Sequence, residues 1–149
     1  MNVFVDSTTL LYTLDPTDVQ KRARCVLWLK TLRLSGALTM SPQVLNETYS
    51  VVMRKPAFGM ARAGIRTHLS DYAAWVTAPL NVEVLVAGWR LQDRFRVSFW
   101  DCLLLASANA TGCAFFLSED LNDGQVYGDV RAINPFRHAP SDVLGRAPS

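Results

Sequence analysis

Residues 3–7 read Val-Phe-Val-Asp-Ser, and the fold that we predict for the whole chain starts from this stretch. Three consecutive apolar residues are typical of a short strand that is buried on both faces of a sheet. An acid and a hydroxyl residue follow at once, which is a common way to begin a helix. A buried strand that passes directly into a helix is the usual opening of a parallel α/β unit.

Strands and helices are predicted to alternate along the rest of the chain. Further short apolar strands are expected at 38–40, 80–82, 114–117 and 130–133, and helices at 7–14, 17–34, 41–54, 60–74, 83–95 and 99–110. In the helix over 17–34 the expected apolar stripe is Ala23, Val26, Leu27 and Leu34. This order predicts an α/β protein: a three-layer α/β/α sandwich around a central parallel sheet of four to five strands.

The length and composition favour one folded domain. A chain of 149 residues can bury a core, and the balance of 50% hydrophobic to 19% charged residues is that of a soluble protein. We place the domain at residues 1–135 and expect a loosely ordered C-terminal tail at 136–149, where prolines accumulate. The three cysteines lack the spacing of a zinc site or a disulfide scaffold. With no signal peptide or membrane span apparent, we expect a cytoplasmic protein.

Four acidic residues stand at strand ends or near helix starts. Asp6 closes the first predicted strand, and Asp120 follows the fourth. Asp101 lies in the first turn of its helix, and Glu47 lies within two turns of the start of its own. Sites in open parallel sheets form at the carboxyl ends of the strands, so the four acids are expected to converge there. Glu47 also interrupts an apolar helix face, which is costly unless the carboxylate is paired or binds a metal.

Each acid taken alone also has a structural explanation. Asp6 and Asp101 suit the starts of helices, where acids cap the chain and complement the helix dipole. Asp120 lies in a segment rich in turn residues, and Glu47 can pack its stem while its head reaches water. The functional hypothesis therefore depends on the four acids together.

The ordered set of motifs resembles the PIN-domain nucleases, and within them the stand-alone VapC-like toxins. The motifs are Val5-Asp6-Ser7, SPQVLNE at 41–47, SFWD at 98–101 and LSEDLNDG at 117–124. The resemblance runs from Asn2 to about Pro135. It implies a catalytic metal site made of Asp6, Glu47, Asp101 and Asp120, with Asp123 as a fifth candidate ligand.

The resemblance also implies roles for neighbouring residues. Ser7 and Ser118 are expected beside the ligands, with Ser7 orienting the first carboxylate or binding a phosphate. Thr8 stands where the family often has asparagine, and Glu119 is expected to point away from the metal. The implied cofactor is Mg²⁺, which Mn²⁺ can replace, because all the ligands are oxygens.

The resemblance implies hydrolysis of RNA phosphodiester bonds, with 5′-phosphate and 3′-hydroxyl products. The implied partners are an RNA substrate, a cognate antitoxin and a second copy of the chain, with no membrane. The net charge of +2 permits an RNA partner. Candidate phosphate contacts are Arg54, Lys55, Arg62, Arg66, Arg94 and Arg96, although any one of them can equally be an ordinary solvated residue.

Two other readings compete with a nuclease. The first is a non-catalytic PIN-like module that binds RNA or a partner, and the four intact acids argue against it. The second is a receiver or aspartyl phosphatase domain. The phosphatase would need an aspartate at the position of Thr8, and the receiver would need a lysine later than Lys55. His68 and His138 are not expected to act in catalysis.

Overall fold

A computed structural model gives the fold, and it describes residues 1–145. Its strands are β1 (Val3–Val5), β2 (Leu38–Thr39), β3 (Phe115–Leu117), β4 (Val126–Tyr127) and β5 (Val130–Ile133). Its α-helices are α1 (Ser7–Tyr12), α2 (Val19–Ser35), α3 (Pro42–Arg54), α4 (Arg62–Ser70), α5 (Val82–Arg94), α6 (Phe99–Ala110) and α7 (Pro140–Leu144). Two short 3-10 helices are η1 (Pro56–Phe58) and η2 (Ala73–Trp75).

The strands form one mostly parallel sheet in the order β2-β1-β3-β5-β4. Only β4, at the edge, runs antiparallel to its neighbour β5. Val5 lies opposite Leu117, so β1 and β3 end side by side. All three residues of β1 are fully buried, as expected for an apolar strand inside a parallel sheet that is covered on both faces.

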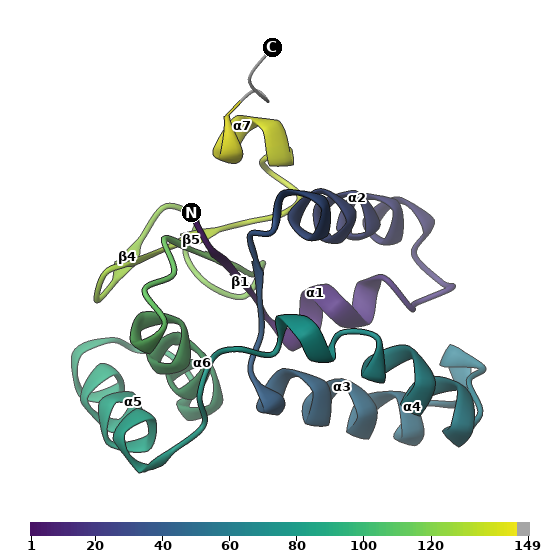
Figure 1. The fold of residues 1–149 in the computed structure, drawn as a ribbon, viewed down its shortest axis with the longest axis horizontal. Coiled ribbons are helices and arrows are strands. Elements are labelled where there is room, and N and C mark those ends of the chain that lie inside the picture. The colour runs from purple at the N-terminus through teal and green to yellow at the C-terminus, as the bar shows by residue number, and fades with distance from the viewer. Residues whose placement is uncertain (146–149) are drawn as a thin grey trace.

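Helices cover both faces of the sheet (Figure 1). In this view α2 and α7 lie on one side, α5 and α6 on the other, and α3 and α4 extend beyond α1 (Figure 1). The predicted three-layer α/β/α sandwich is therefore confirmed. Within residues 1–145, no helix has both the length and the apolar character that crossing a membrane requires.

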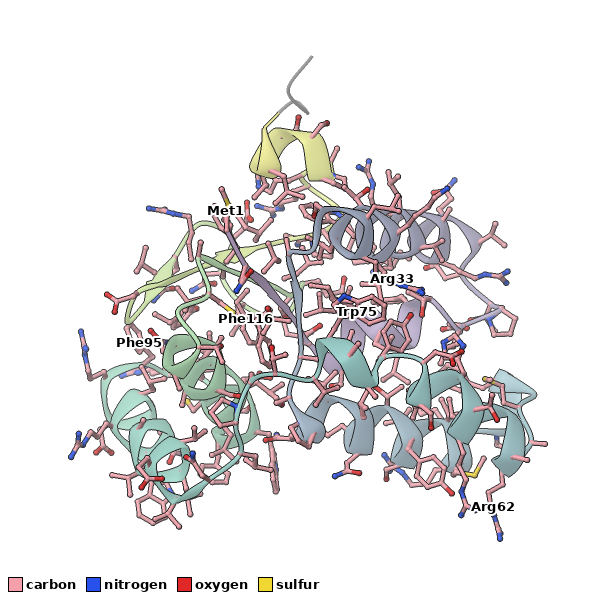
Figure 2. All side chains as sticks on the ribbon, viewed as in Figure 1. Met1, Arg33, Arg62, Trp75, Phe95 and Phe116 are labelled. Atoms are coloured by element: carbon pink, nitrogen blue, oxygen red, sulfur yellow. The ribbon has the colours of Figure 1, made fainter. Side chains whose placement is uncertain are left out.

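The core joins the sheet to α2. The rings of Phe4 in β1 and Phe116 in β3 stack with their centres 5.2 Å apart, and both are fully buried (Figure 2). Trp28 of α2 is also fully buried, and its indole N–H donates to the carbonyl of Pro135 at 3.0 Å. This bond satisfies the one polar group of a large buried ring and ties the segment after β5 to α2.

One predicted strand, 80–82, is wrong. Asn81 instead caps α5, because its side chain accepts a hydrogen bond from the backbone N–H of Val84 at 2.9 Å. A capped helix start turns the chain out of the extended path that a strand needs.

The strand β4 was not predicted. It pairs with β5 through a turn at Gly128, whose φ of 67° lies in the left-handed region. Two residues are too few for β4 to show a periodic pattern.

The stripe predicted for α2 is also wrong. The buried residues are Cys25, Trp28, Leu29 and Leu32, which lie on one helical face. The predicted residues Ala23, Val26, Leu27 and Leu34 are all exposed. Both sets are apolar, so only packing against the sheet decides between them. As a result, α2 presents apolar side chains on its outer surface.

The structure describes residues 136–145 of the predicted tail, and α7 lies among them. The backbone carbonyl of His138 also accepts a hydrogen bond from the Trp28 indole N–H at 3.1 Å. The Nε2 atom of the His138 ring lies 2.8 Å from Oδ2 of Asp123. These contacts hold the start of the segment against the domain. The end of the domain at residue 135 stays a prediction, and residues 146–149 lie outside the described part of the chain.

Candidate functional site

The candidate site begins where the central strands end. Asp6 follows β1 and Ser118 follows β3, and the register of these strands brings the two residues out side by side. The chain after β2, on the other side of β1, leads into α3 with Glu47. The carboxyl edge of a parallel sheet is the usual position of a site in this class of fold.

Asp6 is the most deeply buried of the four predicted acids, with 2% of its surface exposed. It caps α1, because its Oδ1 accepts the backbone N–H of Thr9 at 2.9 Å. Burial raises the pKa of Asp6 to about 7, and the charge of Asp120 adds to the rise, although hydrogen bonds from Ser118 and Thr9 lower it. A cation nearby would favour the ionised form of this carboxyl.

Glu47 is held by one donor on each carboxylate oxygen. The Ser7 hydroxyl donates to Oε2 at 2.8 Å, and the Gln43 side-chain amide donates to Oε1 at 2.8 Å. Gln43 is buried and lies one helical turn before Glu47. The carboxylate is therefore fixed between α1 and α3. Ser7 orients this acid, whereas the sequence predicted that it would serve Asp6 or a phosphate.

Asp120 is held by the loop that carries it and by α1. Its backbone N–H donates to the Ser118 hydroxyl at 3.1 Å, and its Oδ2 accepts the Thr8 hydroxyl at 3.1 Å. Ser118 also forms a hydrogen bond to Asp6 that lowers the pKa of that acid. Ser118 thus contacts two of the acids, and its role beside a metal stays a prediction.

Asp101 lies in the first turn of α6, where its backbone N–H donates to the Ser98 hydroxyl at 3.2 Å. Burial raises the pKa of Asp101, and the charges of Asp120 and Glu47 raise it further, against the hydrogen bond from Ser98. Asp101 therefore lies within electrostatic range of two of the other acids. Glu47 and Asp120 are both hydrogen-bonded to the start of α1, directly after Asp6, so these contacts join three of the four acids.

The arrangement has the chemistry of a magnesium site. Among residues 1–145, no group of three or more His, Cys, Asp or Glu side chains is arranged so that it could hold a metal ion. Mg²⁺ does not need such a group, because it keeps several waters and binds through one or two carboxylates. The four candidate ligands are all carboxylates, which suit Mg²⁺ or Mn²⁺ better than Zn²⁺. The residues present fit a hydrated divalent cation.

The sequence matches the family model of the PIN domain over residues 3–126. The chain belongs to the PIN domain family. Among solved structures, it is similar to VapBC2 from Rickettsia felis bound to promoter DNA, with a TM-score of 0.63 and 11% identity over 89% of this chain and 97% of that one. It is also similar to Mycobacterium tuberculosis VapC20, a toxin that cleaves the sarcin–ricin loop, with a TM-score of 0.56 and 18% identity over 87% and 99% of the chains. No curated protein matches the chain.

In this PIN domain, two further acids of the fourth motif have other partners. Asp123 accepts the backbone N–H of Asn134 at 2.8 Å and pairs with the His138 ring. Burial raises the pKa of Asp123, but these hydrogen bonds outweigh it and lower the pKa overall. Glu119 pairs with Lys21 on α2. Asp123 as a fifth metal ligand stays a prediction, as do the metal roles of the other four acids.

The predicted phosphate contacts all lie on the surface of the PIN domain. The six residues are Arg54, Lys55, Arg62, Arg66, Arg94 and Arg96, and each is exposed. Arg62 lies at the outer end of α4, far from the centre of the sheet (Figure 2). Arg94 is the last residue of α5, and Arg96 lies between α5 and α6, just before the helix that carries Asp101. A role in RNA binding stays a prediction for all six residues.

Sequence reasoning missed three residues around the acids, Gln43, Lys21 and Trp100, and noted Thr8 only as a departure from the asparagine often found there. Gln43 has a sequence signal, since it precedes Glu47 by four positions on one helix. Thr8 and Lys21 contact the Asp120 loop across about a hundred residues of chain, so no local pattern identifies them. Trp100 precedes Asp101 and is 61% exposed, which a motif cannot show.

Proposed function

We propose that the chain is a metal-dependent endoribonuclease that acts as the toxin of a toxin–antitoxin pair. The observation that supports this proposal is that Glu47 and Asp120 are each hydrogen-bonded to α1 directly after Asp6, at the carboxyl edge of a PIN-domain sheet, and that burial and their two charges raise the pKa of Asp101. Four neighbouring carboxylates repel one another, and a divalent cation would relieve that repulsion. The two similar solved structures are of VapC-type proteins, which supports the toxin assignment.

The residues of the chain would prepare this site for RNA hydrolysis. Asp6, Glu47, Asp101 and Asp120 would hold the cation directly or through water. Ser7 and Gln43 keep the Glu47 carboxylate in place, and the cap at the start of α1 keeps Asp6 in place. When bound, Mg²⁺ supplies charge stabilisation to the phosphate and makes a nearby water more acidic. Water attacking the phosphate in line leaves 5′-phosphate and 3′-hydroxyl ends.

The experiment that tests the function uses the purified chain, defined RNAs and mapping of product ends, with and without Mg²⁺. Cleavage that needs Mg²⁺ and leaves 5′-phosphate ends supports the proposal. Products with 2′,3′-cyclic phosphate ends would contradict the mechanism. RNA binding without cleavage would favour the non-catalytic PIN-like module instead.

We propose that Trp100, at the start of α6, binds a nucleobase of the RNA. It adjoins Asp101, and its indole ring is largely open to solvent. We expect Trp100→Ala to raise KM by about 5- to 150-fold, since stacking on an aromatic side chain contributes about 1–3 kcal/mol per base. Trp100→Phe keeps an aromatic face and should recover most of the affinity. Steady-state kinetics on a short single-stranded RNA measure the effect, and an unchanged KM in Trp100→Ala would exclude stacking.

A groove on this chain has a chemistry that suits binding of the proposed antitoxin. A groove of about 480 Å³ lies along α2, with Val26 and Leu34 among its walls and Lys30 and Arg33 beside them. Leu34 is 80% exposed, although it is a large apolar residue. His68 also lines the groove, and its Nε2 is buried without a hydrogen-bond partner within residues 1–145. These features suit a peptide that carries apolar side chains and a carboxylate.

Aromatic residues support the wall of this groove. The Arg33 guanidinium lies 4.9 Å from the ring centre of Trp75 and 5.6 Å from that of Tyr72 (Figure 2). Stacking of this kind holds the guanidinium in one direction, and its N–H groups lie in the plane in which they can meet a carboxylate. The groove therefore combines apolar contact with a fixed positive charge.

Leu34→Asp is expected to weaken neutralisation by the antitoxin about tenfold or more, because it places a charge in an apolar contact. Leu27→Asp makes the same change on α2 at a residue that does not line the groove, and should have little effect. The measurement titrates the purified product of the neighbouring antitoxin gene against RNA cleavage. Equal neutralisation of both variants would rule out this groove. Dimerisation of the chain and a cytoplasmic location remain part of the proposal.

A further inference from the structure

A small polar cluster ties the Asp120 loop to the first two helices. Lys21 of α2 lies 3.0 Å from Glu119 Oε2, and the Tyr12 hydroxyl of α1 donates to Glu119 Oε1. Lys21 also donates to the Tyr12 hydroxyl at 3.3 Å. Within residues 1–145, this is the one ion pair between a lysine or arginine and a carboxylate. We call Lys21, Tyr12 and Glu119 the loop anchor.

Aromatic rings shield the loop anchor. The Lys21 ammonium lies 5.0 Å from the ring centre of Tyr12 and 4.8 Å from that of Phe136, and these two rings meet edge to face. The side chains of Lys21 and Glu119 are 38% and 22% exposed. A partly shielded ion pair is screened less by solvent and salt than one on an open surface. The aromatic rings therefore cover part of the ion pair, and the Tyr12 hydroxyl adds a hydrogen bond to it.

We infer that Lys21 and Tyr12 are positioning residues for Asp120. Glu119 and Asp120 are neighbours in one loop, so anchoring the Glu119 carboxylate on α1 and α2 fixes the backbone from which Asp120 extends. The remaining contacts of Asp120 described above are two single hydrogen bonds, from Thr8 and to Ser118. Lys21 also cancels the charge of Glu119, which would otherwise add a fifth negative charge beside the phosphate of the RNA.

This inference rests on the proposed function and makes a separate prediction about the free protein. Lys21→Met keeps an apolar stem against the Tyr12 and Phe136 rings but removes the charge. We expect it to weaken Mn²⁺ binding about tenfold and to lower kcat about tenfold, since loss of a supporting contact around metal ligands usually costs about 10- to 100-fold. KM for RNA should change much less. Calorimetric titration with Mn²⁺ alone and steady-state kinetics measure the two effects.

Matched variants separate positioning from general charge. Arg22→Met removes the same charge from the next, exposed residue of α2 and should leave Mn²⁺ binding and kcat unchanged. Lys21→Arg should recover most of both. Tyr12→Phe keeps the ring and removes the hydrogen bond to Glu119. It should lower Mn²⁺ affinity and kcat as Lys21→Met does, but by a smaller factor. In a protein that already carries Glu119→Gln, Lys21→Met should cause little further loss of Mn²⁺ affinity or kcat. Both changes remove the same contact, the ion pair between Lys21 and Glu119.

The outcomes distinguish the inference from the function. Wild-type Mn²⁺ affinity and kcat in folded Lys21→Met would overturn the positioning role, and so would equal losses in Lys21→Met and Arg22→Met. Fully additive effects of Lys21→Met and Glu119→Gln would also overturn it. A wild-type protein that neither binds Mn²⁺ nor cleaves RNA would instead refute the proposed function, and the inference with it.

Discussion

Asp6→Asn is expected to abolish metal-dependent RNA cleavage, with a loss of about a thousandfold or more. Charge stabilisation by a catalytic cation contributes several kcal/mol, and each 1.4 kcal/mol corresponds to about tenfold in rate. Stability should change by less than about 1 kcal/mol, since asparagine caps a helix as well as aspartate does. Single-turnover cleavage and thermal unfolding measure the two effects separately.

Asp18→Asn provides a matched control for this variant. Asp18 caps α2 as Asp6 caps α1, with its side chain accepting the backbone N–H of Lys21 at 3.0 Å, but it is not one of the four acids. Its replacement should leave cleavage near the wild-type rate. Glu47→Gln should lose cleavage as Asp6→Asn does. If both Asp6→Asn and Glu47→Gln cleave RNA normally, the proposed site is wrong.

Removal of divalent cations with EDTA is expected to stop cleavage and to lower the melting temperature of the protein. Mg²⁺ or Mn²⁺ should restore both properties. A cation at a hundred times its Kd stabilises the folded state by about 2.7 kcal/mol. For a domain of this size, that free energy corresponds to a rise of about 5–10 °C. Scanning calorimetry across a Mg²⁺ series measures the shift.

The same series in Asp6→Asn shows whether the stabilisation comes from the proposed site. The melting temperature of this variant should respond weakly to Mg²⁺, because one of the four carboxylates is gone. Cleavage that continues at the wild-type rate in EDTA would exclude a metal mechanism. An equal rise in melting temperature for wild type and Asp6→Asn would place the cation elsewhere on the protein.

The parts of the site that depend on local order could be predicted from the sequence. β1 with Asp6 directly after it is a continuous stretch, and the SFWD motif at 98–101 holds both Asp101 and Ser98, the residue that caps its helix. Such caps and buried strands involve residues within one or two turns of each other, so a single chain reveals them. The PIN family followed from the order of four such local motifs.

The predictions that proved wrong concern segments for which the sequence is compatible with two local structures. Asn81 suits either a strand or a helix cap, and the structure uses it as a cap. In α2, two apolar faces compete, and the fit of Trp28 against the segment after β5 selects one of them. Local propensity is similar for both choices, so packing decides.

By itself, the sequence determined the alternation of strands and helices and the family, and it predicted four acids at the carboxyl edge of the sheet. Only the tertiary structure decided how two of these acids are held, Glu47 by Ser7 and Asp120 by Thr8, and how Lys21 holds Glu119 beside Asp120. These pairs join segments 40 to 112 residues apart. A contact over such a distance exists only after the sheet and its helices have packed, so no local pattern in the chain specifies it.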